Sequence, residues 1–182
     1  WLVNILLELM FGQSSENYEF LYDEGLIDSS FFYDYTEEQS FGFSVIGSNT
    51  DQPDKLAETL LQQVNDFRAK KINENDFLRV KRKYIGSLLR SLNSLEYIAN
   101  EYTRYQFNGM NLFDVTKLLE EITLDDIETV LHDHFVESSF TVCQIVPHSE
   151  WVEDINGGLP LKYALITGAS GGIGKAIALK LA

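Results

Sequence analysis

The order of two kinds of hydrophobic pattern along the chain most constrains its fold. Two segments rich in Phe, Tyr, Ser and Val with roughly alternating polarity, residues 27–35 and 40–46, predict an antiparallel hairpin with a polar turn at 36–38. Apolar residues then recur at helical spacing until about residue 135, and residues 140–146 return to an apolar, strand-like run. This order favours an α+β fold in which an antiparallel sheet has helices packed on one face.

The helical signals divide into separate elements. A helix is expected at residues 2–10, and a second, capped by Ser14 or Ser15, is expected to stop at Gly25. Five more are expected at about 51–70, 74–92, 94–107, 112–121 and 124–135. The only cysteine, Cys143, excludes an intrachain disulfide and is expected to be a small buried side chain on the last strand.

Charge and glycine content change abruptly near the C-terminal end. All 28 acidic residues lie at or before Asp154, so residues 1–160 carry a net charge of −17, whereas the remainder carries +3. Half of the 12 glycines follow residue 156. We therefore expect an acidic domain at 1–146, a linker at 147–160 and a distinct segment at 161–182. The stripes of the acidic domain and its returning strand form a closed pattern, so this domain is expected to fold without the rest.

The net charge of −14 argues against nucleic acid or an anionic membrane as a partner. No apolar run approaches the roughly 18 residues that a membrane-spanning helix needs. With a single cysteine and no signal-peptide pattern, a cytoplasmic protein is expected. The chain begins at Trp1 within a helical pattern, so we also expect further residues upstream in the parent protein.

The acidic domain resembles the second half of insulinase-like (pitrilysin or mitochondrial processing) zinc metallopeptidases. The resemblance rests on the helix before Gly-Gln-Ser-Ser at 12–15, the helix ending in Asp-Glu-Gly-Leu at 23–26, the hairpin, and the later Arg-Val-Lys-Arg-Lys-Tyr and Leu-Asn-Ser-Leu-Glu stretches. It implies a non-catalytic half that closes over a catalytic half and forms a chamber for peptides. The zinc would be bound by the inverted motif H-x-x-E-H of that other half, which is missing here.

The resemblance also implies where this half would touch substrate. In active relatives a glycine-rich loop, an Arg and a Tyr hold the substrate backbone. Here the loop is Gly12-Gln13-Ser14-Ser15, the Arg position is Tyr22 and the Tyr position is Asp28. Gly12, Ser14, Ser15, Tyr22 and Asp28 are therefore the substrate-loop candidates. Two interpretations stay open: another subunit supplies the missing groups, or this half is a scaffold that only packs.

The residues themselves predict no catalytic set and no metal site in this chain. His132 and His134 are two apart on an expected helix and therefore point away from each other, which predicts solvated side chains rather than zinc ligands. The cluster Arg79, Lys81, Arg82 and Lys83 is interpreted as the solvated face of a helix.

Residues 161–182 predict a strand, a glycine turn and an Ala-rich helix, which together favour phosphate binding at a helix N-terminus. The segment resembles the opening of short-chain dehydrogenases/reductases, so a truncated β-α Rossmann unit with its strand in a parallel sheet is expected. The resemblance implies NAD(P) contacts at Thr167, Gly168, Ser170, Gly172, Ile173 and Gly174. The Tyr-x-x-x-Lys pair of that family is absent, so no cofactor is expected to bind this chain alone. Read-through or fusion of neighbouring genes would explain the junction.

Three functional hypotheses follow. The first is a chamber-forming, non-catalytic half of an insulinase-like zinc peptidase, inactive alone, whose partners are a catalytic half or homologous subunit and a peptide substrate. The second is an NAD(P)-dependent short-chain reductase with an acidic accessory domain and a truncated core. The third is an α+β module that binds a protein partner.

Overall fold

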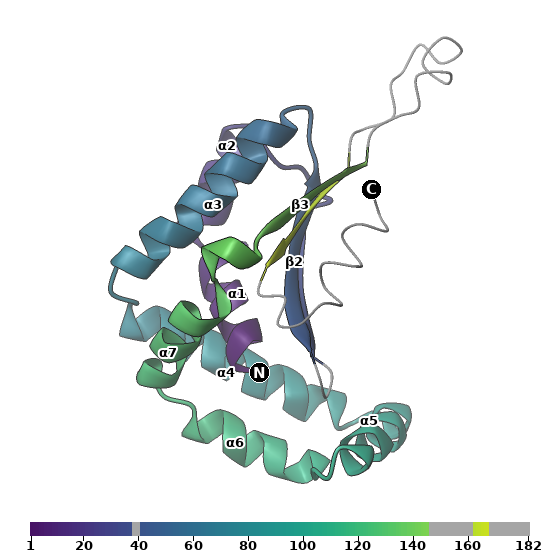
Figure 1. Cartoon of the computed structure of the whole chain (residues 1–182). Coiled ribbons are helices and arrows are strands. Elements are labelled where there is room, and N and C mark those ends of the chain that lie inside the picture. The colour runs from purple at the N-terminus through teal and green to yellow at the C-terminus, as the bar shows by residue number, and fades with distance from the viewer. Residues whose placement is uncertain (38–40, 146–161, 168–182) are drawn as a thin grey trace, which may run out of the picture.

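The computed structural model describes residues 1–37, 41–145 and 162–167. It shows helices packed beside one antiparallel sheet (Figure 1). The helices are α1 Leu2–Phe11, α2 Glu16–Asp23, α3 Pro53–Ala69, α4 Glu74–Ser91, α5 Leu95–Phe107, α6 Val115–Glu121 and α7 Leu124–His134, with short 3₁₀ turns at Leu112–Asp114 and Glu137–Ser139. The strands are β1 Phe32–Glu37, β2 Gly42–Asn49, β3 Thr141–Ile145 and β4 Lys162–Thr167. The α+β class is thus confirmed. None of the described helices is both long enough and apolar enough to cross a bilayer.

Helix α1 is the centre of the hydrophobic core. Eight of its ten residues are buried, and Ile5, Leu6 and Met10 are completely so. A helix that is apolar on nearly all sides has no face to offer to water and is therefore enclosed. It contacts α2, α4, α7 and β1, which makes it the element around which the others pack.

The helix boundaries follow local signals that the sequence carries. Ser15 caps α2 by accepting from the Tyr18 N–H, Asn73 caps α4, and Thr123 forms a capping box with Asp126 at the start of α7. Gly25 ends the α2 region with a φ of 64°, a conformation that glycine adopts without steric cost. The helix positions expected from the sequence are accordingly confirmed to within a few residues.

The hairpin begins later than expected. Its first strand starts at Phe32 rather than residue 27, because Leu26 and Ile27 are buried after the Gly25 turn and Asp28 then holds the Ser30 N–H at 2.7 Å in a local turn. Thr36 and Glu37 belong to β1, so the expected turn at 36–38 is wrong for those two positions. The antiparallel pairing itself is confirmed, with Tyr35 opposite Ser44.

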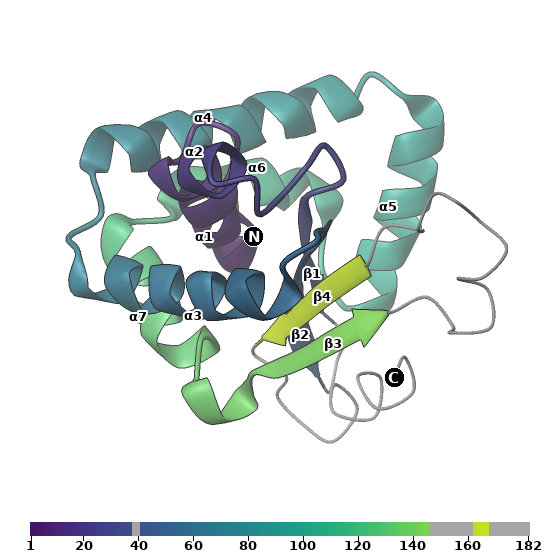
Figure 2. The same ribbon diagram turned by 90° about the horizontal axis from the view of Figure 1, so that it is seen from above.

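The order of strands in the sheet is β1-β2-β4-β3. The sequence pattern predicts instead that the returning strand, β3, completes the sheet without any strand from residues 161–182. Strand β3 pairs with β4, and β4 pairs with β2, both antiparallel, so β4 lies between the hairpin and the returning strand (Figure 2). The two long edges of β4 each satisfy backbone N–H and C=O groups of a neighbour. The sheet of the acidic segment is therefore not closed by its own residues, contrary to the expectation from its sequence pattern.

The same finding corrects the expected environment of residues 162–167. A Rossmann start places its first strand in a parallel sheet, but β4 is antiparallel to both strands it contacts. The described residues show no parallel β-α unit. The glycine turn and helix expected at 168–182 lie outside the described residues, as does the expected linker at 147–160.

Candidate functional site

The loop from Gly12 to Ser15 is a tight connection between two helices. The N–H of Gly12 donates to the Glu8 carbonyl at 2.9 Å and closes α1, and the N–H of Ser15 donates to the Gly12 carbonyl at 2.8 Å. The Ser15 hydroxyl oxygen then accepts from the Tyr18 N–H at 3.1 Å and opens α2. Local hydrogen bonds therefore fix the shape of this candidate loop.

Glycine at position 12 is required by space rather than by backbone conformation. Its φ is −60°, which any residue can adopt. A Cβ built there would come within 2.5 Å of both the carbonyl oxygen and the Oε1 atom of Glu8. The loop and the Glu8 carboxylate consequently pack too closely for any side chain at this position.

The Glu8 carboxylate is buried and accepts from two other elements. Its side chain is 8% exposed, Tyr33 of β1 donates its hydroxyl to Oε2 at 2.7 Å, and Lys83 of α4 donates to Oε1 at 2.7 Å. Burial, followed by the hydrogen bond to Glu8, raises the pKa of Tyr33, and burial raises the pKa of Tyr84 to about 12. These phenols are therefore neutral donors at physiological pH.

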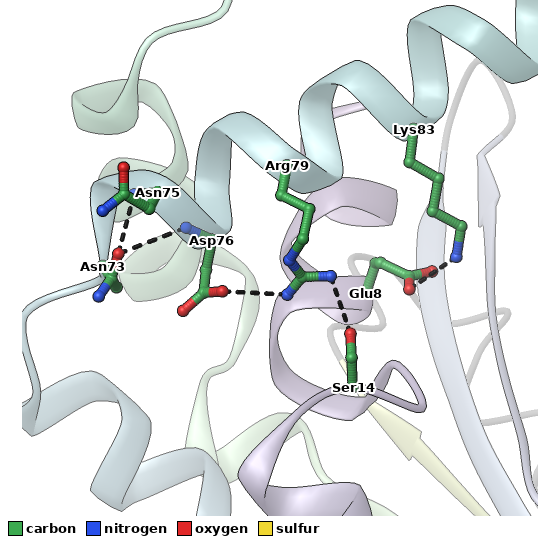
Figure 3. A network of polar contacts seen from close by, with 7 residues as sticks. All are labelled: Glu8, Ser14, Asn73, Asn75, Asp76, Arg79 and Lys83. Atoms are coloured by element: carbon green, nitrogen blue, oxygen red, sulfur yellow. Dashed lines mark hydrogen bonds and ion pairs between the residues drawn. The ribbon is translucent and has the colours of Figure 1, made fainter.

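Helix α4 also holds the loop directly (Figure 3). Arg79 donates from Nη1 to the Ser14 hydroxyl oxygen at 2.8 Å and from Nη2 to Asp76 Oδ1 at 3.1 Å. Since Arg79 and Lys83 are four residues apart on one helix, they point to the same side. One face of α4 thus fixes Ser14 and Glu8, the two sides of the Gly12 turn.

The interpretation of the basic cluster as a solvated helix face is confirmed for Arg79, Arg82 and Lys83, which are exposed, but the cluster also makes contacts that the interpretation did not include. Arg79 and Lys83 remain about half exposed, at 49% and 60%, yet both bind the loop region. Lys81 donates to the carbonyls of Glu120 and Ile122, each at 2.7 Å, and so ties α4 to the end of α6. Sequence reasoning missed these roles because each partner lies far away along the chain.

The two other substrate-loop candidates have surroundings of their own. Tyr22 is 57% exposed on α2, and its ring stacks on Tyr18 at a centroid distance of 6.3 Å. Asp28 accepts from the Ser30 N–H and hydroxyl, and these hydrogen bonds lower the pKa of its carboxyl group. Position 22 therefore offers one phenol in place of a guanidinium, and position 28 offers an ionised acceptor in place of a donor.

A hollow of about 240 Å³ lies beside the loop. Its lining includes Ser14, Ser15 and Arg79, together with Lys70 and Lys71 after the end of α3. Lys70 forms an exposed ion pair with Glu16 at 3.6 Å. Acidic side chains also line the hollow, so its net charge is balanced rather than strongly positive.

The histidines do not form a zinc site in the described part of the chain. His132 is exposed as expected, but His134 is not: its Nε2 lies 2.6 Å from the Ser44 hydroxyl oxygen, and its ring meets those of Tyr35 and Phe135 edge-on. Burial lowers the pKa of His134 to about 4. Among the described residues no group of three or more His, Cys, Asp or Glu side chains could hold a metal ion, and His148 lies outside them.

The expected NAD(P)-contact residues fall almost wholly outside the described structure. Thr167 is the last residue of β4, and Gly168, Ser170, Gly172, Ile173 and Gly174 follow beyond it. Cys143 is buried on β3, as the sequence predicts.

Comparisons with known proteins give consistent matches. Residues 1–84 match the family model described as the peptidase M16 inactive domain. The chain is 45% identical over 148 residues to the uncharacterized zinc protease YmfH of Bacillus subtilis, covering 81% of this chain and 34% of that protein. A crystal structure of an M16-like peptidase from Alicyclobacillus acidocaldarius superposes with a TM-score of 0.65 at 31% identity, covering 71% of this chain and 31% of that one.

The chain therefore spans about a third of the length of these relatives. The family model and the solved structure are both described as M16 or M16-like, and the curated relative is described as a zinc protease; none of the three supports a fused dehydrogenase. Residues 1–84 are thus similar to the inactive domain of M16 peptidases, and the chain is similar over most of its length to part of a zinc protease.

Proposed function

We propose that this chain contributes the non-catalytic wall of the peptide chamber of an M16 zinc peptidase and hydrolyses peptides only together with a catalytic half or homologous subunit. The observation that carries the proposal is the match of residues 1–84 to the inactive domain. It is supported by the candidate loop, which hydrogen bonds hold in place, while the expected Arg and Tyr positions nearby carry Tyr22 and Asp28. Helix α4 contacts the loop at Ser14 through Arg79 and the adjacent Glu8 through Lys83, and these contacts favour a single loop conformation.

The chemistry at positions 22 and 28 supports a scaffolding role. An arginine holds a peptide carbonyl through several N–H donors in a fixed fork, whereas the phenol of Tyr22 has a single donor on an exposed, stacked ring. Asp28, with its lowered pKa, is ionised at neutral pH and donates nothing to a carbonyl oxygen. Substrate-holding donors would therefore come from another subunit.

The described residues do not fit zinc. A catalytic zinc needs three protein ligands around one point, but the His134 ring is packed against Tyr35 and Phe135 and bonded to Ser44. His132 faces solvent on the same helix. Zinc in the assembled enzyme would then belong to the half that carries H-x-x-E-H, and no step of hydrolysis is assigned to residues of this chain.

Reconstitution tests this proposal. The purified chain, after extensive dialysis, is assayed with a quenched fluorescent peptide and added zinc, alone and together with an H-x-x-E-H half from the same genome. We expect no hydrolysis and no stoichiometric zinc for the chain alone, and chelator-sensitive hydrolysis in the mixture that exceeds the catalytic half by itself. Zinc-dependent hydrolysis by the chain alone would contradict the proposal.

We further infer that the dehydrogenase-like segment 161–182 gives this chain no reductase activity. The antiparallel pairing of β4 supports this, because pyrophosphate binding at a Rossmann turn relies on neighbouring parallel strands. Titration of NADPH, followed by its fluorescence, should show no saturable binding. Binding in the micromolar range that is lost in Gly172→Asp would refute the inference.

A further inference from the structure

Helix α5 contributes no buried residue to the described fold. It is 13 residues long and lies at the end of the structure away from α2 and α3 (Figure 1). A surface helix of a globular protein normally buries one apolar stripe. Here Leu95 and Phe107, at its two ends, are 84% and 83% exposed. Its contact with the hydrophobic core comes from partly buried side chains, among them Tyr97 and Tyr105.

A continuous groove runs between α5, α6 and β1. Two adjoining cavities of about 610 and 440 Å³ share four lining residues, Tyr105, Met110, Val115 and Leu118. Val115 forms a buried part of the wall, while Met110 and Leu118 are 50% and 54% exposed. The four shared residues carry mainly apolar side chains, and they form the floor of the groove.

The rim of this groove is acidic. Asp34 and Glu37 of β1 line the larger cavity, and Asp114 lines the smaller one. The one arginine in the lining, Arg104, is bonded to Glu101 at 2.5 Å, so its charge is largely compensated. Trp1 also lines the groove.

We propose that this groove seats an amphipathic helix with an apolar stripe and a basic flank, supplied by the polypeptide that completes the peptidase. The apolar floor matches the stripe, and the carboxylates of Asp34, Glu37 and Asp114 match the basic flank. The chain matches only about a third of the length of each of these relatives, so about two thirds of such a polypeptide is available to supply this helix. The occupant rests on the proposed function, since it belongs to the same enzyme.

The probes are two synthetic helices of equal length with the same leucine stripe, one with lysine and one with glutamate on the polar face. Their binding to the full chain is followed by fluorescence anisotropy at physiological salt. We expect the lysine helix to bind and the glutamate helix not to bind. Leu118→Asp should weaken binding of the lysine helix about tenfold or more, because it removes apolar contact from the groove floor.

Leu89→Asp is the matched control, because Leu89 is 50% exposed on α4 and receives the same added charge outside the groove. It should leave the affinity within about twofold, a difference below 0.5 kcal/mol. A second pair tests the rim: Glu37→Gln should weaken binding and Glu58→Gln, on α3, should not.

Equal effects of Leu118→Asp and Leu89→Asp would show general electrostatic attraction and overturn the proposal, as would absence of binding. Self-association that Leu118→Asp abolishes in light scattering would assign the groove to a second copy and also overturn it. None of these measurements uses peptide hydrolysis. The groove proposal can therefore be refuted while reconstitution supports the proposed function, or be supported while reconstitution refutes that function.

Discussion

Gly12 lies directly against the side chain of Glu8: a Cβ at position 12 would be 2.5 Å from Glu8 Oε1 and 2.5 Å from its carbonyl oxygen. Lys83 and Tyr33 donate hydrogen bonds to the two oxygens of this carboxylate, so it is not free to move away. The loop that the family resemblance singled out thus sits on a buried polar cluster. Its position depends on contacts between α1, β1 and α4.

Gly12→Ala should destabilise the protein by about 1–3 kcal/mol, because one of the two clashing atoms is a backbone carbonyl that cannot rotate away. Urea denaturation, followed by far-UV circular dichroism, measures the change. Gly86→Ala is the control: it lies inside α4 with no atom within 4 Å of the added Cβ, and should stabilise by about 0.5–1 kcal/mol. Similar effects of the two substitutions would contradict the packing described here.

Lys83→Met should cost about 1–2 kcal/mol, since it leaves the buried Glu8 carboxylate with only the Tyr33 hydroxyl among its side-chain partners in the described structure. This range is reduced for the solvent exposure of Lys83, which is 60%. Lys55→Met breaks an ion pair with Glu24 in which both side chains are about half exposed, and should change stability by less than about 0.5 kcal/mol. The free energies of unfolding of both variants are measured at low and high salt. Equal losses in the two variants would contradict the role described for Lys83.

His134 should make stability depend on pH in mildly acidic solution. Its folded pKa of about 4 lies below the unfolded value of about 6.5, so between these values the unfolded chain binds more protons. Stability is complete above about pH 6.5 and declines as the pH falls through this window, by up to about 3 kcal/mol. His134→Gln, which stays neutral, should flatten this part of the profile relative to His132→Gln, an exposed control. Identical profiles would show that His134 does not titrate as described.

Leu165→Pro tests the placement of β4. This residue pairs with Ile46 of β2 and Val142 of β3, so proline would remove a backbone donor from the middle of the sheet and should cost about 3 kcal/mol or more. Gly157→Pro, in the linker expected from the sequence, should have a much smaller effect. An unchanged thermal transition in Leu165→Pro would instead support the sequence-based expectation that residues 1–146 fold without the C-terminal segment.

The sequence determined those features whose causes lie within a few residues of each other. The stripe of Leu56, Leu60 and Val64 has the helical period and gave the position of α3. Caps such as Asn73 act on N–H groups two and three residues away, so they mark helix starts without knowledge of the fold. The loop at Gly12 could be found by its resemblance to a family, although its physical reason could not.

Only the tertiary structure decided the contacts between distant residues. Glu8 and Lys83 are separated by 75 positions, and Ser44 and His134 by 90, so no local period or spacing links either pair. The place of β4 between β2 and β3 was equally hidden, because a short apolar run such as residues 163–166 pairs as readily in a parallel as in an antiparallel sheet. The packing of α1 against α2, α4, α7 and β1 decides which strands β4 can pair with. That packing depends on residues from the whole described chain.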